Sequence, residues 1–329
     1  MNARANRRDF ITLLGGAAVA WPLAARSQQP MPVIGFLHGA SAEGYAPMVD
    51  GFRRGLAESG YVEGRNVTID YRWAEGHYDR LPVLAAELVH RQVAGIVTGG
   101  TPAALAAKGA TLTIPIVINV GIDPVQAGLV ASLNRPGGNV TGLAILTAEL
   151  AAKRLELLHE ALPTTTVVAL LVNPTTPLTE PETRGVRDAA RSLGLQLHVL
   201  NASTESEINT AFGILVELRA GALVVSVDTF INNQRAQIVA LAARHAVPAI
   251  YGVREFATSG GLMSYGNDLV DSYRQSGIYA AKILKGEKPA DLPVQQVVRV
   301  EFVINLKSAK TLGLTFPITL LGRADEVIE

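Results

Sequence analysis

The chain has 329 residues, of which 48% are hydrophobic and 18% are charged, so it is long enough for about two domains and apolar enough to bury a core. Lys and Arg together number 29, as do Asp and Glu, which leaves no basic excess to hold a nucleic acid backbone. The sequence has no cysteine, which excludes disulfides, thiolate-held zinc, iron–sulfur clusters and a cysteine nucleophile.

The N-terminal segment has the pattern of an export signal. Residues 10–25 carry no charge and are flanked by the pair Arg7-Arg8 and by Arg26. This apolar stretch is shorter than the roughly 20 residues of a membrane-spanning helix, and glycine and proline interrupt it. A charged start, a short apolar segment and small residues at its end are typical of a secretory signal, and paired arginines indicate the twin-arginine type. We therefore expect residues 1–27 to be a removable signal peptide; a basic amphipathic membrane anchor is the alternative.

Apolar runs then alternate with segments of helical periodicity in both halves of the chain. Runs of this length, separated by amphipathic helices, are typical of a parallel sheet covered by helices on both faces. The first series of runs is Val33–Leu37, Val67–Tyr71, Val93–Val97 and Ile114–Val120, and the second is Val167–Val172, Leu195–Leu200, Ala222–Val227 and Pro248–Tyr251.

The two halves also resemble each other in detail. Each reads apolar strand, polar tip, helix, then a second strand opened by Ile114-Pro115 or Val247-Pro248. A repeat of this kind predicts an α/β fold with two similar Rossmann-like lobes. Ligands of open α/β sheets bind beyond the carboxyl ends of the strands, so we expect a ligand cleft between the lobes.

Five short segments carry a resemblance to a known family. The segments are Gly60–Val67 (GYVEGRNV), Thr101–Ala104 (TPAA), Asp123–Val125 (DPV), Arg135–Gly142 (RPGGNVTG) and Ile283–Ala290 (ILKGEKPA). Together they resemble the type I periplasmic solute-binding proteins of ABC importers, in the branch associated with amino-acid-like and often aromatic ligands.

The resemblance implies a chain that passes three times between the lobes. Lobe one would contain residues 31–143 and 266–292, and lobe two residues 144–265 and 293–329. It also implies a periplasmic monomer that closes its lobes on a small molecule and delivers it to an ABC permease in the inner membrane.

Motifs of enzymatic chemistry are missing from the sequence. There is no G-x-x-x-x-G-K-[ST] loop, no G-x-G-x-x-G after a strand and no G-x-S-x-G elbow. The six histidines show no metal-ligand spacing. We therefore expect no cofactor, no metal and no catalytic residue. A secreted hydrolase or racemase that uses Asp228 and Asp123 as acid and base is the alternative.

Candidate ligand-binding residues in lobe one stand where strands end. Ser41 follows the first strand and offers a hydroxyl, and Trp73 ends the second with a flat ring. Thr101 is expected to cap a helix whose N-terminus favours an anion. Asp123 lies in the next tip. For each of the four, an ordinary turn, cap or packing role is the competing interpretation.

Candidate residues in lobe two follow the same logic. Asp228 ends an apolar run and is expected to accept a hydrogen bond from a ligand ammonium or amide group. Opposite the helix at Thr101, it suits a ligand that carries a carboxylate, such as an amino acid or aromatic acid. The other candidates offer amide, hydroxyl or aromatic groups, with turns and core packing as alternatives: Asn173, Thr175, Phe230, Tyr251 and Tyr265.

The export signal can be tested directly. Replacing Arg7-Arg8 by Lys-Lys should leave the precursor in the cytoplasm, because the twin-arginine receptor reads the paired arginines. Cell fractionation and immunoblotting measure the processed fraction. Normal processing of the Lys-Lys precursor would contradict the assignment.

Overall fold

The computed structural model describes residues 31–145 and 147–329, and Pro32–Glu329 forms one compact unit. The signal peptide expected over residues 1–27 lies outside the described residues. Nothing in the described ranges is a helix long and apolar enough to cross a membrane.

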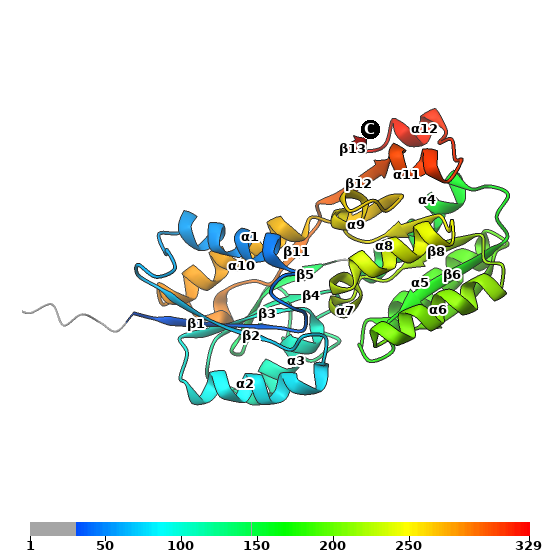
Figure 1. Ribbon diagram of the computed structural model, residues 1–329. Coiled ribbons are helices and arrows are strands. Elements are labelled where there is room, and N and C mark those ends of the chain that lie inside the picture. Colours follow the sequence, from blue (N-terminus) through cyan, green and yellow to red (C-terminus); the bar gives the residue numbers. More distant parts are fainter. Residues whose placement is uncertain (1–30, 146) are drawn as a thin grey trace, which may run out of the picture. The chain divides into compact units, whose positions relative to one another are not determined.

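The first lobe is a parallel sheet between two pairs of helices (Figure 1). Helices α1 (Ala46–Glu58) and α10 (Leu269–Leu284) cover one face, and α2 (Leu81–His90) and α3 (Thr101–Ala110) cover the other. Short 3-10 turns lie at Tyr78–Arg80 and Pro289–Asp291. In spatial order, the strands described in this sheet are β2 (Thr68–Trp73), β1 (Val33–His38), β3 (Gly95–Gly99), β4 (Ile116–Val120), β5 (Val140–Ile145) and β11 (Gln295–Val297).

The second lobe repeats this plan. Helices α4 (Thr147–Ala161) and α5 (Thr179–Ser192) pack on one face, and α6 (Glu205–Glu217) and α8 (Arg235–Arg244) pack on the other. In spatial order its strands are β7 (Gln196–Asn201), β6 (Val167–Val172), β8 (Ala222–Val225), β9 (Ala249–Tyr251), β10 (Met263–Asn267), β12 (Val300–Asn305) and β13 (Glu326–Ile328). The short helices are α7 (Thr229–Asn233), α9 (Arg254–Thr258), α11 (Leu306–Thr311) and α12 (Ile318–Leu321).

Both sheets are wound in the same order, which confirms the predicted α/β class with two similar Rossmann-like lobes. In each lobe the first strand (β1 or β6) lies between the second and third strands, and the chain then proceeds outward. The ladders are parallel except for β12, which runs antiparallel to β10. The point where the winding reverses is where such sheets leave a crevice at their carboxyl ends.

The chain passes between the lobes a few residues later than expected. Strand β5 continues to Ile145 in the first sheet and β10 continues to Asn267 in the second. Strand β11 pairs with β5, so the assignment of residues 293–297 to lobe two is corrected to lobe one. Two of the three residues of β11 are exposed, so the segment lacks the apolar run that marks a buried strand.

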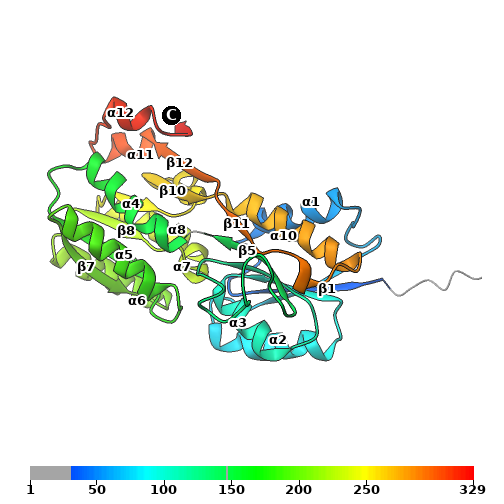
Figure 2. The ribbon, with the colours of Figure 1, turned by 180° about the vertical axis from the view of Figure 1, so that it is seen from behind.

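Close packing of α1 against α10 fixes the position of α10, which contributes residues to the site described below. Figures 1 and 2 both show the two helices side by side. A Cβ atom on Gly55 would lie 1.8 Å from the carbonyl oxygen of Arg274, and one on Gly277 would lie 2.2 Å from that of Phe52. Any side chain larger than hydrogen at these positions would force the helices apart, so the glycines set the position of α10.

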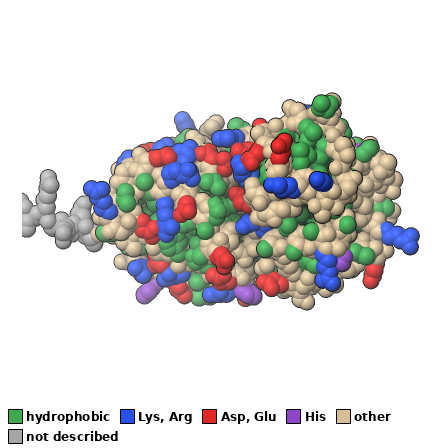
Figure 3. Space-filling view, turned by 45° about the horizontal axis from the view of Figure 1, so that its top comes forward, with side chains coloured by type: hydrophobic (Ala, Val, Ile, Leu, Met, Phe, Trp, Pro, Cys, Tyr) green, Lys and Arg blue, Asp and Glu red, His purple; other side chains and the backbone are tan. Residues whose placement is uncertain are grey.

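Charged side chains are dispersed on the surface but form an ion pair in the interior of lobe two. On the face shown in Figure 3, basic and acidic side chains are interspersed rather than gathered by sign. Inside lobe two, Arg154 of α4 and Glu182 of α5 form a fully buried ion pair with an N–O distance of 2.6 Å. Glu182 also accepts a hydrogen bond from Ser226, which follows β8. The pair thus ties both helices to the strand end that leads into the site.

Candidate functional site

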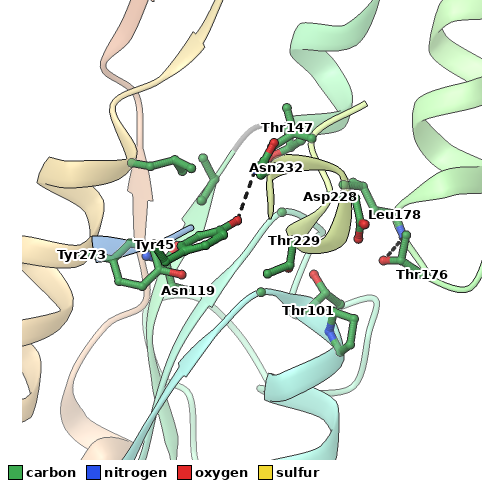
Figure 4. Close-up of a pocket in the computed structure, with 16 residues that line it drawn as sticks. Tyr45, Thr101, Asn119, Thr147, Thr176, Leu178, Asp228, Thr229, Asn232 and Tyr273 are labelled. Carbon is green, nitrogen blue, oxygen red and sulfur yellow. Dashed lines mark hydrogen bonds between the residues drawn. The ribbon is translucent and has the colours of Figure 1, made fainter. Parts of the chain in front are cut away.

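A cavity lies at the carboxyl ends of the strands of both lobes (Figure 4). The cavity is open to solvent, and its space of about 470 Å³ includes the open space at its mouth. Lobe one contributes residues from the cap of α1, from β4 and β5, from α10 and from the start of α3. Lobe two contributes them from the loops after β6 and β8, from the start of α4 and from α7. The described residues that line it are Tyr45, Gly100, Thr101, Pro102, Asn119, Gly121, Ile145, Thr147, Thr176, Leu178, Val227, Asp228, Thr229, Asn232, Leu269 and Tyr273.

The start of helix α3 forms one part of the lobe-one wall. The cap position belongs to Gly100, with φ of 88°, and Thr101 is the first helical residue, which corrects the expectation that Thr101 is the cap. No side chain among the described residues caps this helix, and its second residue, Pro102, has no N–H, so Thr101 and Ala103 carry the N–H groups that its start can offer to a ligand. A Cβ atom on residue 100 would lie 2.4 Å from Oγ1 of Thr229, so glycine is required where the lobes meet.

Two buried tyrosines form the deeper part of this wall, and a buried histidine stands behind one of them. His38, at the end of β1, is fully buried, and burial lowers the pKa of its imidazole from 6.5 to about 3. The ring is therefore neutral near pH 7. Its Nδ1 atom accepts a hydrogen bond from the Ala40 N–H at 3.0 Å, and its Nε2 atom lies 2.7 Å from the hydroxyl of Tyr273. The rings of Tyr273 and Tyr45 are 6.3 Å apart between centroids, and both line the cavity.

Asp228 dominates the lobe-two wall. Its Oδ1 atom accepts hydrogen bonds from the backbone N–H groups of Phe230 and Ile231 and from the side-chain amide of Asn173. Its Oδ2 atom accepts a 2.8 Å hydrogen bond from the hydroxyl of Tyr78, which belongs to lobe one. Burial raises the pKa of Asp228, and these hydrogen bonds oppose the rise. The carboxyl group of Asp228 also caps helix α7.

Further polar contacts join α7 to lobe one. The Tyr78 hydroxyl accepts a hydrogen bond from the Phe230 N–H at 2.8 Å. The Ser41 hydroxyl donates to Oδ1 of Asn233 at 2.6 Å. The side-chain amide of Asn232 donates to the Tyr45 hydroxyl at 3.3 Å, which is the contact drawn as a dashed line in Figure 4. The lobes are therefore in direct contact around the cavity.

The structure brings four of the expected residues to the cavity or directly behind it. Thr101 and Asp228 line it from opposite lobes. Asn173 stands behind Asp228, and Thr175 donates to Oδ1 of Asn173 at 2.8 Å. The neighbouring Thr176, rather than Thr175, reaches the cavity wall. Ligand binding by these residues stays a prediction.

Two other expected residues lie at the contact between the lobes. Ser41 binds Asn233, as described above. Phe230 is buried in α7, and a Cβ atom on Gly76 of lobe one would lie 3.3 Å from its ring. Both residues act where lobe two meets lobe one, and neither is among the described residues that line the cavity.

Trp73 and Asp123 are placed away from the cavity, which corrects the expectation for both. Trp73 lies in an outer groove of lobe one, nearly parallel to Tyr71 with ring centroids 6.3 Å apart. Asp123 is exposed and accepts hydrogen bonds from the N–H groups of Val125 and Gln126, the usual role of an aspartate in a turn.

Tyr251 and Tyr265 pack within lobe two, and here the core interpretation is the one that the structure supports. Tyr251 is 1% exposed and stacks on Phe256 with centroids 4.4 Å apart. Tyr265 meets Phe302 edge-on at 6.0 Å across the antiparallel pair of strands. Neither side chain is among the described residues that line the cavity.

Sequence reasoning missed the amide and tyrosine residues of the wall. Tyr45 is the cap residue of α1 and Tyr273 belongs to α10, so neither stands at a strand end, where the candidate residues were expected. Asn119 did leave a signal, because it is a polar residue inside the apolar run Ile116–Val120. Asn232 lies in a short helix next to Asp228. Among the described residues, no group of three His, Asp or Glu side chains is placed to hold a metal ion.

Residues 33–328 match the family described as ABC transporter substrate binding protein, and the chain belongs to this family. It is therefore the solute-binding component of an ABC transport system. It is 30% identical over 265 residues to a tyrosine-binding protein of Clostridioides difficile, covering 80% of this chain and 76% of that protein. It also matches an ABC domain from Streptococcus pneumoniae solved in complex with L-Trp, with a TM-score of 0.82, 28% identity and coverage of 90% and 99%.

The ligand-free, open structure of CD0873 from Clostridium difficile also matches, with a TM-score of 0.63 and 25% identity, covering 91% of this chain and 99% of that one. In the structure described here, the contacts of α7 with Tyr78, Ser41 and Tyr45 join the two lobes.

The buried imidazole of His38 makes stability depend on pH. Between pH 6.5 and about 3 the unfolded chain binds a proton at His38 that the folded chain does not, so this residue lowers the free energy of unfolding as pH falls. The slope is about 1.4 kcal/mol per pH unit. From pH 6 to pH 4, we expect the wild type to lose about 2.5 kcal/mol of stability relative to His38→Phe, measured by urea unfolding.

Phenylalanine is the matched replacement, because it keeps a ring that can stack on Phe36 as His38 does, with centroids 5.9 Å apart. The hydrogen bonds lost on substitution add an offset that is the same at every pH. A stability difference that stays constant from pH 7 to pH 4 would contradict the buried neutral state of His38.

Proposed function

We propose that this protein is a periplasmic receptor that closes its two lobes on an amino acid with an aromatic side chain and delivers it to an ABC permease. The observation that carries the proposal is the cavity at the strand ends of both lobes, enclosed by hydrogen bonds from α7 to Tyr78, Ser41 and Tyr45. Closure of two lobes around a ligand is how a hinged receptor couples binding to conformation.

The chemistry of the walls supports a ligand with both donor and acceptor groups. The uncapped start of α3, at Thr101, favours a carboxylate, and Asp228 on the opposite wall supplies negative charge. Apolar side chains of Ile145, Leu178 and Leu269 offer contact for a hydrophobic side chain. The relatives named for tyrosine and solved with L-Trp support the same ligand class.

A catalytic role for Asp228 and Asp123 has no geometric support. Acid and base groups act on one substrate only when both reach it. Asp228 lines the cavity, whereas Asp123 is held in an exposed turn by Val125 and Gln126. We therefore propose a receptor without catalytic activity or cofactor.

The proposal also includes export to the periplasm, a monomeric state and a permease as partner. The paired arginines Arg7-Arg8 and the uncharged stretch after them support twin-arginine export to the periplasm. Membership of the substrate-binding family supports delivery to a membrane permease. The protein would act as a monomer, since each chain supplies both walls of the cavity.

Binding of L-tyrosine or L-tryptophan is the direct test. A ligand that binds only the folded state adds about 2.7 kcal/mol of stability at a hundredfold excess over Kd. We expect one of these amino acids to raise the melting temperature in a saturable way, with a single site by calorimetry, and glucose to leave it unchanged. Failure of both amino acids to bind at millimolar concentration would refute the proposed ligand class.

A further inference from the structure

Two side chains of the lobe-one wall have hydrogen-bonding directions that their neighbours determine. Asn119 is one of them, with 3% of its surface exposed. Its amide nitrogen donates to Oγ of Ser272 at 2.8 Å and lies 3.4 Å from Oγ of Ser276. The Ser276 hydroxyl donates its own proton to the carbonyl oxygen of Ser272, so its oxygen can only accept from Asn119. This assigns the amide nitrogen to the serine side and leaves Oδ1 on the other.

The Oδ1 atom of Asn119 is a buried acceptor in need of a donor. It has no hydrogen-bond partner within the described part of the chain. Asn119 nevertheless lines the cavity. Burying an acceptor without a partner is unfavourable, so a ligand that donates a hydrogen bond to Oδ1 of Asn119 supplies the missing partner.

Tyr273 is the second side chain, and its direction follows from the tautomer of His38. A backbone N–H can only donate, so Nδ1 of His38, which accepts from Ala40, carries no proton. A neutral imidazole then has its proton on Nε2, and that proton is donated to the Tyr273 oxygen at 2.7 Å. The phenol keeps its own proton to donate elsewhere, and the described residues offer it no acceptor.

The donor and the acceptor are neighbours. Ser272, which orients Asn119, directly precedes Tyr273 in α10. Figure 4 draws Tyr45, Tyr273 and Asn119 together on one side of the cavity, with Asp228 on the other. A Cβ atom on Gly99 would lie 2.4 Å from the Tyr273 hydroxyl, so this hydroxyl lies against the end of β3, from which α3 begins.

We propose that Asn119 and Tyr273 recognise the head of an α-amino acid, with Oδ1 of Asn119 accepting from the ligand ammonium and the Tyr273 hydroxyl donating to the carboxylate. This assignment rests on the proposed function and defines its ligand more narrowly, as an amino acid whose amino and carboxyl groups are both free. His38, Ser272 and Ser276 are positioning residues, since they touch Asn119 or Tyr273 and not the cavity.

The proposal reassigns the ammonium site from Asp228 to Asn119. Asp228 already accepts four hydrogen bonds, one of which comes from Tyr78 across the lobes. The described residues that line the cavity include no Lys or Arg, so a ligand carboxylate meets neutral donors there. The Tyr273 hydroxyl beside the uncapped start of α3 supplies them.

The test separates the two ends of the ligand. Calorimetry would use whichever of L-tryptophan and L-tyrosine binds more tightly, its amine without the carboxylate (tryptamine or tyramine), and its acid without the amine (indole-3-propionate or 3-(4-hydroxyphenyl)propionate). Tyr273→Phe should weaken the amino acid and the acid about tenfold or more and leave the amine unchanged. Asn119→Leu should weaken the amino acid and the amine to a similar degree and leave the acid unchanged.

Three further variants separate recognition from folding. Asn119→Asp keeps an acceptor, so it should bind the amino acid at least as tightly as the wild type where Asn119→Leu does not. Tyr279→Phe is a matched control on α10, because its hydroxyl binds the Pro293 carbonyl and not the cavity, and it should leave all three probes unchanged. Tyr78→Phe removes a lobe-to-lobe contact and should weaken every probe by the same factor.

The outcomes are distinct. A wild type that binds neither amino acid refutes the proposed function. A wild type that binds while Tyr273→Phe and Asn119→Leu leave the amino acid unchanged, or weaken all three probes equally, refutes only the assignment of the two ends. If the analogues bind too weakly to measure, equal losses in Asn119→Leu and Asn119→Asp refute it as well.

Discussion

The contact between the Tyr78 hydroxyl and helix α7 is the interaction on which the closed cavity depends. One hydroxyl donates to the Asp228 carboxylate and accepts from the Phe230 N–H, so it reaches the start of a helix that belongs to the other lobe. The same carboxylate caps that helix. The carboxyl group of Asp228 therefore caps helix α7 and also holds this helix against lobe one. The cavity wall and the contact between the lobes both depend on this one buried group.

Rigidity on the lobe-one side comes from a different source. Glycines let α1 and α10 approach to backbone contact, and this places Ser272 and Tyr273 against the ends of β3 and β4. The neutral imidazole of His38 and the serine hydroxyls then orient a donor and an acceptor without any ionised group. Hydrogen bonds of known direction at a buried wall can discriminate a zwitterion by geometry, because an unpaired buried group is costly.

Much of the fold was predictable because buried parallel strands leave long apolar runs. The runs around β1, β3, β4, β6 and β8 matched the strands, and the repeat in the sequence corresponds to the repeated winding of the two sheets. Strand β11 has no such apolar run, since it is short and mostly exposed. For this reason the third passage between the lobes was predicted a few residues too early.

The site was predictable only where it is built from strand ends. That reasoning identified Thr101 and Asp228, and it also selected Tyr251 and Tyr265, whose rings pack inside lobe two. An aromatic residue at a strand end can face a ligand or the core. The periodicity and composition of the sequence do not distinguish these two cases. Tyr273 was out of reach for another reason: it stands more than two hundred residues from its partner His38, and only the packing of α10 brings them together.

A crystal structure of the protein with bound L-tyrosine or L-tryptophan tests the central claim most directly. We expect an amino acid between the lobes, with its ammonium nitrogen about 3 Å from Oδ1 of Asn119 and a carboxylate oxygen about 3 Å from the Tyr273 hydroxyl. We also expect Tyr78 to bind Asp228 in that complex. An amino acid bound with its head reversed, or one whose ammonium displaces Tyr78 from Asp228, would contradict it.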